Sequence, residues 1–256
     1  MNDIEVRELD YSSGGRQILE NICVNITKNK FVGLIGPNGS GKTTMLRHIY
    51  RALPCGKRRI FIHNKPLEDF SCRESAREIT VMRQENMGEF DYSVLEMVVM
   101  GRFPHKKFYE ANVKYDRELA SKALRYVGME HSSENSFCNL SGGEKQRVLI
   151  ARSLVQNANI ILLDEPTNHL DVHYQWRILK LIKDLRKTTL AVFHDLNHSI
   201  AFCDYIYVLN QGKIVSQGCP SEIITEKLLR EVFKVETQII KRYDGLPQVV
   251  YFGAVV

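Results

Sequence analysis

The chain has 256 residues, of which 44% are hydrophobic and 25% charged, the composition of a globular protein with a full core. Its net charge of +5 is spread along the sequence, so nucleic acid is not indicated as a partner. The six cysteines include no C-x-x-C pair, the N-terminus has no basic segment leading into an apolar run, and no apolar run approaches the roughly 20 residues that cross a bilayer. Secretion, a disulfide framework and a membrane span are therefore not expected.

Short apolar runs alternate with stretches of helical period, which predicts an α/β fold with a buried, mostly parallel sheet. Strands are expected at residues 31–35, 79–82, 160–164, 189–193, 205–209 and 213–216, and helices at 42–51, 174–186 and 197–203. Residues 87–139 lack a strand-like run and carry apolar residues at helical spacing, so they are interpreted as a helical subdomain inserted into a core of residues 1–86 and 140–256. The tail, 241–256, shows no clear period.

Residues 36–43 read GPNGSGKT and stand between the apolar run FVGLI and a stretch of helical period. Glycines let the backbone curl so that successive N–H groups face phosphate oxygens, and the new helix adds its positive end. Lys42 supplies charge to the outer phosphates, and Thr43 offers a hydroxyl to Mg²⁺. The alternative is a glycine-rich turn before a helix, and the register of strand, loop, lysine and threonine argues against it.

Residues 160–165 read IILLDE, so two carboxylates follow a buried strand at the sheet edge where α/β proteins bind ligands. Asp164 suits Mg²⁺, because a hard cation prefers oxygen ligands. Glu165 faces another direction on the pleat and is placed to polarise a water for attack on a γ-phosphate. Two acids that only end a strand at the surface are the alternative, which weakens in a chain that has a phosphate loop.

Residues 140–144 read LSGGE and precede the helical sequence KQRVLIARSLV. Ser141 is a good N-cap, and Gly142 and Gly143 leave backbone amides uncovered at a helix N-terminus. These features are consistent with a second anion site, although the segment alone is more typical of a plain helix cap than of a ligand site.

The order of GPNGSGKT, LSGGEKQR, IILLDEP, NHLD and a later histidine resembles the ATP-binding subunits of ABC transporters over nearly the whole chain. The resemblance implies a RecA-like P-loop NTPase core with a mixed sheet, ATP and Mg²⁺ as cofactors, and ATP hydrolysis. It also implies a Walker A loop made of Gly36, Pro37, Asn38, Gly39, Ser40, Gly41, Lys42, Thr43 and Thr44.

The same resemblance assigns further nucleotide contacts. Tyr11, an aromatic residue in a polar Gly-Ser stretch, would stack on adenine. Ser141, Gly142 and Gly143 would close over the γ-phosphate of a nucleotide held by the other subunit. Asp171 matches the D-loop aspartate, although NHLD departs from the SALD often found there.

Four more positions take roles in hydrolysis from the resemblance. Gln84 would contact Mg²⁺ or the attacking water and report to the membrane partner. Asp164 would be the Walker B aspartate and Glu165 the catalytic base. His194 would be the switch histidine.

The expected partners follow from the same family. A loop that holds ATP from one side leaves the γ-phosphate exposed to solvent, so a head-to-tail homodimer is expected to complete the site. The dimer would lie on the cytoplasmic face of the membrane, as a peripheral subunit beneath two permease subunits fed by an extracytoplasmic binding protein. Residues 93–105, SVLEMVVMGRFPH, resemble the segment found in importers of iron chelates, haem and cobalamin.

Two alternatives stay open at this point. A single-cassette ABC ATPase could act as a mechanical clamp or assembly factor without transport. The string HDLNH, residues 194–198, nearly matches the zincin motif H-E-x-x-H. A zincin would need both histidines on one exposed helix face, whereas His194 directly follows an apolar strand-like run and no third ligand is obvious.

Overall fold

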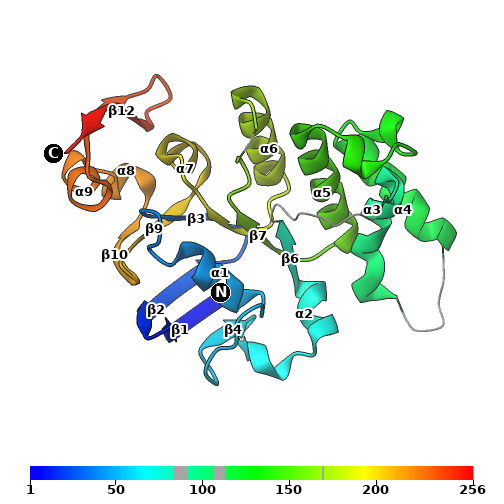
Figure 1. The fold of residues 1–256 in the computed structure, drawn as a ribbon, viewed down its shortest axis with the longest axis horizontal. Coiled ribbons are helices and arrows are strands. Elements are labelled where there is room, and N and C mark those ends of the chain that lie inside the picture. Colours follow the sequence, from blue (N-terminus) through cyan, green and yellow to red (C-terminus); the bar gives the residue numbers. More distant parts are fainter. Residues whose placement is uncertain (83–90, 107–112, 169, 256) are drawn as a thin grey trace. The chain divides into compact units, whose positions relative to one another are not determined.

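The computed structural model describes residues 1–82, 91–106, 113–168 and 170–255. The chain divides into two units. In Figure 1 the colour follows the residue number, from blue at the N-terminus to red at the C-terminus. The first unit comprises Met1–Asp69 and Ile182–Val256, and the second comprises Phe70–Leu181. Within the described residues, no helix combines the length and hydropathy needed to span a bilayer.

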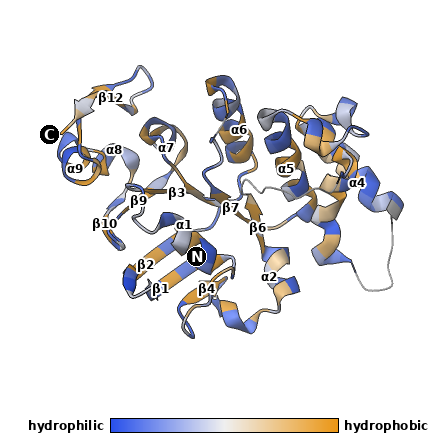
Figure 2. Ribbon diagram, in the orientation of Figure 1, coloured by the Kyte–Doolittle hydropathy of each residue, from blue (hydrophilic) through white to orange (hydrophobic). Residues whose placement is uncertain are grey.

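The first unit begins with an antiparallel sheet that the sequence analysis did not predict. Its strand order is β2-β1-β4-β5, with bounds Asn2–Ser13 for β1, Arg16–Thr27 for β2, Ile60–Ile62 for β4 and Lys65–Pro66 for β5. Figure 2 shows apolar and polar residues alternating over parts of β1 and β2, because one face of this sheet is buried and the other is not.

The first unit also contains the predicted parallel strands. Their order is β10-β9-β3-β8, with bounds Phe31–Ile35 for β3, Thr188–Val192 for β8, Tyr205–Asn210 for β9 and Lys213–Gly218 for β10. β3 is parallel to β8 and β9, whereas β10 is antiparallel to β9, so the sheet is mixed. All five residues of β3 are buried, as expected for a central parallel strand with both faces covered.

The remaining elements of the first unit are short. Its helical segments are Lys42–Ile49 (α1), Leu67–Asp69 (3-10), Leu196–Phe202 (α7), Pro220–Ile223 (α8), Glu226–Leu228 (α9) and Leu229–Phe233 (π). The chain ends in an antiparallel hairpin of β11 (Val235–Lys241) and β12 (Pro247–Ala254).

The second unit pairs two parallel strands, β6 (Ile79–Met82) and β7 (Ile160–Asp164). Its helices are α2 (Cys72–Glu78), α3 (Val94–Val99), α4 (Val113–Tyr126), α5 (Gly142–Gln156) and most of α6 (Val172–Asp184), which ends in the first unit. It also has 3-10 turns at Met100–His105, Glu130–Ser132 and Phe137–Asn139. Gln156 ties α5 to β6, because its side chain donates to the carbonyl oxygens of Ala76 (2.7 Å) and Ile79 (2.9 Å).

The predicted α/β class is confirmed, and β3, β6 and β7 have the predicted bounds. β8 lies one residue earlier than predicted, α1 ends two residues earlier, and α6 and α7 are shifted by two and one residues. The tail that showed no period contributes β12. α3 and α4 fall within the predicted insertion at 87–139, whose boundaries stay a prediction.

Candidate nucleotide site

The predicted phosphate loop connects β3 to α1 and is closely surrounded at two glycines. A Cβ at Gly36 would lie 1.9 Å from the backbone oxygen of Leu209 in β9. Gly41 has φ +106, and a Cβ there would lie 2.7 Å from the Leu19 side chain and 2.9 Å from the Ile18 oxygen in β2. Only glycine fits at either position, so β9 and β2 together fix the path of the loop.

The interior of the loop is positively charged. Lys42 is 5% exposed, and its Nζ donates to the carbonyl oxygens of Gly36 (2.8 Å) and Pro37 (2.9 Å). α1 starts from the left-handed Gly41, and no side chain among the described residues caps this helix. A helix that begins without a side-chain cap presents first-turn amides and the positive end of its dipole to an anion. Apart from Gly39 and its two chain neighbours, no atom of the described residues lies within 4 Å of a Cβ built at Gly39, so this loop position is open in the part of the chain that the structure describes.

Tyr11 lies beside the loop helix. Its half-buried ring packs edge-on against His48 of α1, with ring centroids 4.6 Å apart and an interplanar angle of 72°. Its cross-strand neighbour in β2 is Leu19, the residue that faces Gly41. The β1–β2 sheet therefore brings the predicted adenine-stacking residue to the loop. His48 was not predicted as a site residue; it is fully buried, and burial lowers the pKa of its imidazole.

The predicted carboxylates stand at the end of β7 in the second unit. Asp164 is its last residue and is half-buried. Glu165 follows with φ +53, a left-handed conformation that turns the chain out of the strand. Asn168 closes this turn: its side-chain amide donates to Oε2 of Glu165, and its backbone N–H donates to the Glu165 oxygen at 3.2 Å. Asn168 was not predicted as a site residue. The one feature of the sequence that points to it is that NHLD begins with asparagine where SALD begins with serine.

Ser141 begins α5 with a capping box. Its Oγ accepts from the N–H of Glu144 (3.4 Å), and the Glu144 carboxylate accepts from the N–H (2.9 Å) and hydroxyl (2.7 Å) of Ser141. These bonds hold the pKa of Glu144 below its usual value. Gly142 is exposed, whereas Gly143 is buried beside the Tyr174 ring, 3.4 Å from a Cβ built at Gly143.

Three predicted residues lie outside these clusters. Asp171 is exposed immediately before α6, and its backbone oxygen accepts from Gln175 N–H at 3.0 Å. His194 is exposed between β8 and α7 in the first unit. Gln84 lies outside the described residues, so its predicted contact stays a prediction.

The zincin alternative has no geometric support. His198 lies inside α7 and is 4% exposed, whereas His194 precedes the helix, so the two do not share an exposed helix face. Across the part of the chain that the structure describes, no group of three or more His, Cys, Asp or Glu residues could hold a metal ion.

A profile of the ABC transporter family matches residues 19–168, more than half of the chain. The chain belongs to the ABC transporter family. Ferric enterobactin transport ATP-binding protein FepC of Escherichia coli (strain K12) is 35% identical over 251 residues, which cover 96% of this chain and 93% of FepC. Iron(3+)-hydroxamate import ATP-binding protein FhuC of Bacillus subtilis (strain 168) is 34% identical over 244 residues, 94% of this chain and 91% of FhuC.

A solved structure gives the same result. The dimeric post-hydrolysis state of the ATP-binding cassette MJ0796, bound to ADP and Pi, is 29% identical with a TM-score of 0.73, and the match covers 85% of this chain and 98% of that one. The expected P-loop NTPase fold and the identification as an ATP-binding subunit are confirmed. The chain is therefore an ATPase that binds ATP and works within a transporter complex.

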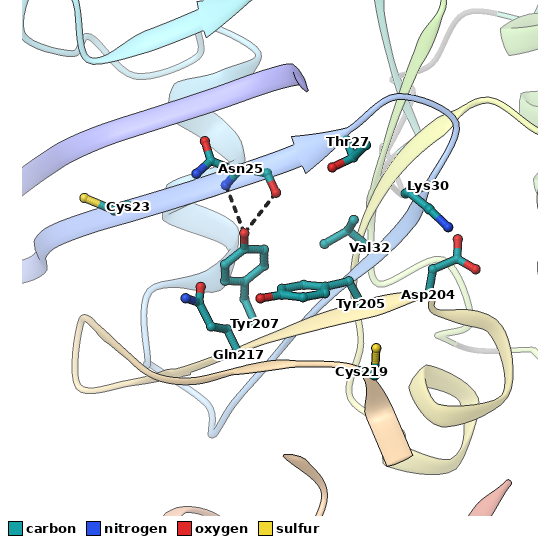
Figure 3. A pocket seen from close by; sticks show the side chains of 10 residues that line it. All are labelled: Cys23, Asn25, Thr27, Lys30, Val32, Asp204, Tyr205, Tyr207, Gln217 and Cys219. Atoms are coloured by element: carbon teal, nitrogen blue, oxygen red, sulfur yellow. Dashed lines mark hydrogen bonds between the residues drawn. The ribbon is translucent and has the colours of Figure 1, made fainter. Parts of the chain in front are cut away.

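This ABC ATPase also has a pocket of about 510 Å³ in its first unit (Figure 3). Lys30 and Val32 line it at the N-terminal end of β3, whereas the Walker A loop follows the C-terminal end of that strand. Asn25 N–H donates to the Tyr207 hydroxyl, which donates to the Asn25 oxygen, both at 2.9 Å. None of the predicted nucleotide-site residues that the structure describes is among the residues lining this pocket.

Proposed function

We propose that this chain is the MgATP-hydrolysing motor of an importer of iron chelates, the class that includes ferric siderophores and haem. The observation that carries the ATPase part is the Walker A loop, which excludes a Cβ at Gly36 and Gly41 and leads into a helix with no side-chain cap among the described residues. The names of FepC and FhuC support the cargo class. The resemblance of residues 93–105 to iron-chelate importers supports it as well.

Phosphate binding is the task of the loop backbone and Lys42. The N–H groups of the loop and of the first turn of α1 donate to the phosphate oxygens. The buried Lys42 ammonium turns from its own loop carbonyls to the outer phosphates. Tyr11 stacks on adenine from its position beside α1. The phosphate contacts and the stacking on adenine both form in the complex before hydrolysis, so they determine the affinity for ATP.

Thr43 and Asp164 carry oxygen donors of the kind that Mg²⁺ takes, and both side chains are half-buried. We assign the ion to these two residues together with Gln84. When bound, Mg²⁺ neutralises charge on the β- and γ-phosphates.

Hydrolysis requires a base that is held in place. Glu165 fits this role, because its left-handed backbone and the amide of Asn168 orient the carboxylate. His194, exposed at the end of β8, is the second polar group assigned to the γ-phosphate.

The working form that we infer is a head-to-tail homodimer. Gly142, Gly143 and the Ser141 hydroxyl of one copy cover the γ-phosphate held by the other, and Asp171 lies at the same interface. The dimeric state of MJ0796 with ADP and Pi supports this arrangement. Two permease subunits and an extracytoplasmic binding protein complete the importer, with the ATPase peripheral on the cytoplasmic face and no nucleic acid involved.

The Glu165→Gln substitution tests this function most directly. We expect MgATP affinity within twofold of the parent and a kcat lower by about 10²–10⁴-fold, the usual contribution of a general base. ATP should then hold the variant as a stable dimer. Phosphate release measures the first effect, and size-exclusion chromatography with light scattering measures the second.

Two companion variants make this experiment interpretable. Glu118→Gln makes the same chemical change on an exposed position of α4 and should keep the parent rate. Lys42→Ala should weaken MgATP binding in equilibrium dialysis by about 10–100-fold, because hydrogen bonds to charged groups contribute about 1.5–3 kcal/mol. Parent-rate hydrolysis by Glu165→Gln, or unchanged affinity in Lys42→Ala, would overturn the assignment.

The cargo is tested with the same variants in cells. In cells whose own copy is deleted, the parent chain should restore uptake of ferric hydroxamate labelled with radioactive iron. Glu165→Gln should not restore it. Uptake that is equal without the chain would contradict the proposed cargo while leaving the ATPase assignment intact.

A further inference from the structure

The C-terminal hairpin packs against the helix that follows His194. β12 contacts α7, and both lie in the first unit (Figure 1). Val249, in the middle of β12, is 2% exposed and pairs with Ile239 of β11. The hairpin is therefore anchored to the unit through β12.

Asn197 connects the two elements by a pair of hydrogen bonds to one residue. Its Nδ2 donates to the Val249 oxygen (3.1 Å), and its Oδ1 accepts from the Val249 N–H (2.8 Å). A neighbouring strand satisfies the backbone of one residue in the same way, with one donor and one acceptor. The amide side chain thus replaces a strand at the edge of β12.

A second observation concerns Asp195, two residues before Asn197. Asp195 N-caps α7, because its Oδ1 accepts from the N–H of His198 (3.1 Å). Tyr251 of β12 lies close enough to Asp195 that burial and this carboxylate raise the pKa of its phenol to about 12. The hairpin is therefore bonded to α7 at Asn197, the third residue after His194, and the charge of Asp195, the first residue after His194, acts on Tyr251 of β12.

The other side of this segment is fixed to the core. Leu196 is 3% exposed, Ile200 is 2% exposed and Ser199 is fully buried, with its hydroxyl donating to the Leu196 oxygen at 2.7 Å. Packing holds α7 from the core, and the hairpin holds it from the outer side. His194 is exposed at the end that both contacts restrain.

We propose that the β11–β12 hairpin orients His194 for ATP hydrolysis, and that Asn197 is the positioning residue through which it does so. The inference rests on the proposed role of His194. Asn197 touches no substrate in this scheme. It acts by limiting the directions in which the segment 194–197 can move.

The test uses Asn197→Ala and the isosteric Asn197→Asp in the full chain. Asp keeps the acceptor for the Val249 N–H but loses the donor and sets a carboxylate against the Val249 oxygen. Both variants should lower kcat by about 10-fold or more, since misplacing a reacting group can cost up to about 10²-fold. KM for MgATP should stay within twofold of the parent. Gln238→Ala, an exposed amide on the same hairpin, is the control and should keep the parent kcat.

A double-mutant cycle with His194→Ala separates positioning from general damage. If Asn197 acts through His194, adding Asn197→Ala to His194→Ala should not lower the residual single-turnover rate further. A purely structural role would lower the rate in both backgrounds by the same factor, which would overturn the proposal. Asn197→Asp carries the same cycle if the alanine variant unfolds.

The two proposals fail in different ways. Parent-rate hydrolysis by His194→Ala would remove the role assigned to His194 under the proposed function, and the positioning role with it. An inactive His194→Ala together with parent kcat in both Asn197 variants would overturn the positioning role alone.

Discussion

The helices α1 and α5 both begin after a glycine-containing motif, but they begin in different ways. α1 starts from the left-handed Gly41, without a side-chain cap among the described residues. The ammonium group of Lys42 donates to the carbonyl oxygens of the same loop. α5 starts from the extended Ser141, whose capping box with Glu144 satisfies first-turn groups from within the chain.

The difference indicates how each segment uses a ligand. A helix start without a cap gains an acceptor when a phosphate binds, so the loop before α1 is suited to bind nucleotide in a single copy. The start of α5 is already stabilised by its own side chains. It is suited to add contacts to a nucleotide that another loop holds, in agreement with the proposed dimer.

The two helix starts should differ most in how MgATP affinity responds to alanine in place of a glycine, at Gly36 before α1 and at Gly143 in α5. In Gly36→Ala the new Cβ would lie 1.9 Å from the Leu209 backbone oxygen, so loop or strand must move. We expect MgATP affinity to fall by at least about 10²-fold, because the loss of even one or two charge-assisted bonds, each contributing about 1.5–3 kcal/mol, has this effect. Equilibrium dialysis at concentrations that keep the chain monomeric measures it.

Gly143→Ala is the matched variant at α5. Its Cβ would meet the Tyr174 ring at 3.4 Å, an ordinary contact, and alanine is favoured over glycine in a helix by about 1 kcal/mol. Monomer affinity for MgATP should therefore equal that of the parent. Equal losses of affinity in both variants would remove the distinction between the two helix starts.

The elements that could be predicted from the sequence are those whose pattern lies within one short segment of the chain. The parallel strands are continuous apolar runs, and the Walker A loop is one uninterrupted motif, so both were found. The β1–β2 sheet was missed because register shifts between Val6 and Leu9 and between Leu9 and Tyr11 interrupt its alternation. The hairpin in the tail becomes visible only when Val249 is seen against α7.

The contacts that orient the predicted site residues were missed for a related reason. His48 lies 37 positions from Tyr11, and Asn197 lies 52 positions from Val249, so neither pairing has a spacing rule. Asn168 is only three residues from Glu165, but its contact depends on the left-handed backbone of Glu165. Non-glycine residues adopt that conformation in only a few per cent of cases, so a glutamate at position 165 does not predict it.

A smaller effect is expected at the capping box of α5. Ser141→Ala removes the acceptor for the Glu144 N–H and should lower the free energy of unfolding by about 1 kcal/mol. Ser93→Ala is a close control, since Ser93 forms the same capping box with Glu96 at the start of α3. Urea unfolding should show similar losses in both variants, whereas only Ser141→Ala should lower kcat. A parent-like kcat in Ser141→Ala would leave Ser141 with a capping role alone.

The smallest effect concerns pH, and it should differ between the two helix starts. Burial lowers the pKa of His48 beside α1 below its ordinary 6.5, so the unfolded chain binds the proton more readily than the folded one. The stability that this histidine contributes is present above pH 6.5 and is lost as pH falls from there through the lowered pKa. The Glu144 pKa at α5 is lowered from 4.5 by its bonds to Ser141, so the capping box keeps its contribution above pH 4.5 and loses it only as pH falls further.

Unfolding free energies of the parent, His48→Phe and Glu144→Gln, measured from pH 7.5 to 3.5, test this separation. His48→Phe keeps a ring against Tyr11 but cannot titrate, so it should flatten the slope below about pH 6.5, where one proton contributes at most about 1.4 kcal/mol per pH unit. His198 in α7 titrates in the same direction in both proteins, because burial lowers its pKa as well, so the parent–variant difference isolates His48. Glu144→Gln should change the slope only below about pH 4.5. If His48→Phe keeps the parent slope, His48 is not buried against Tyr11 in solution. The placement of Tyr11 beside α1 and the Walker A loop would then have to be revised.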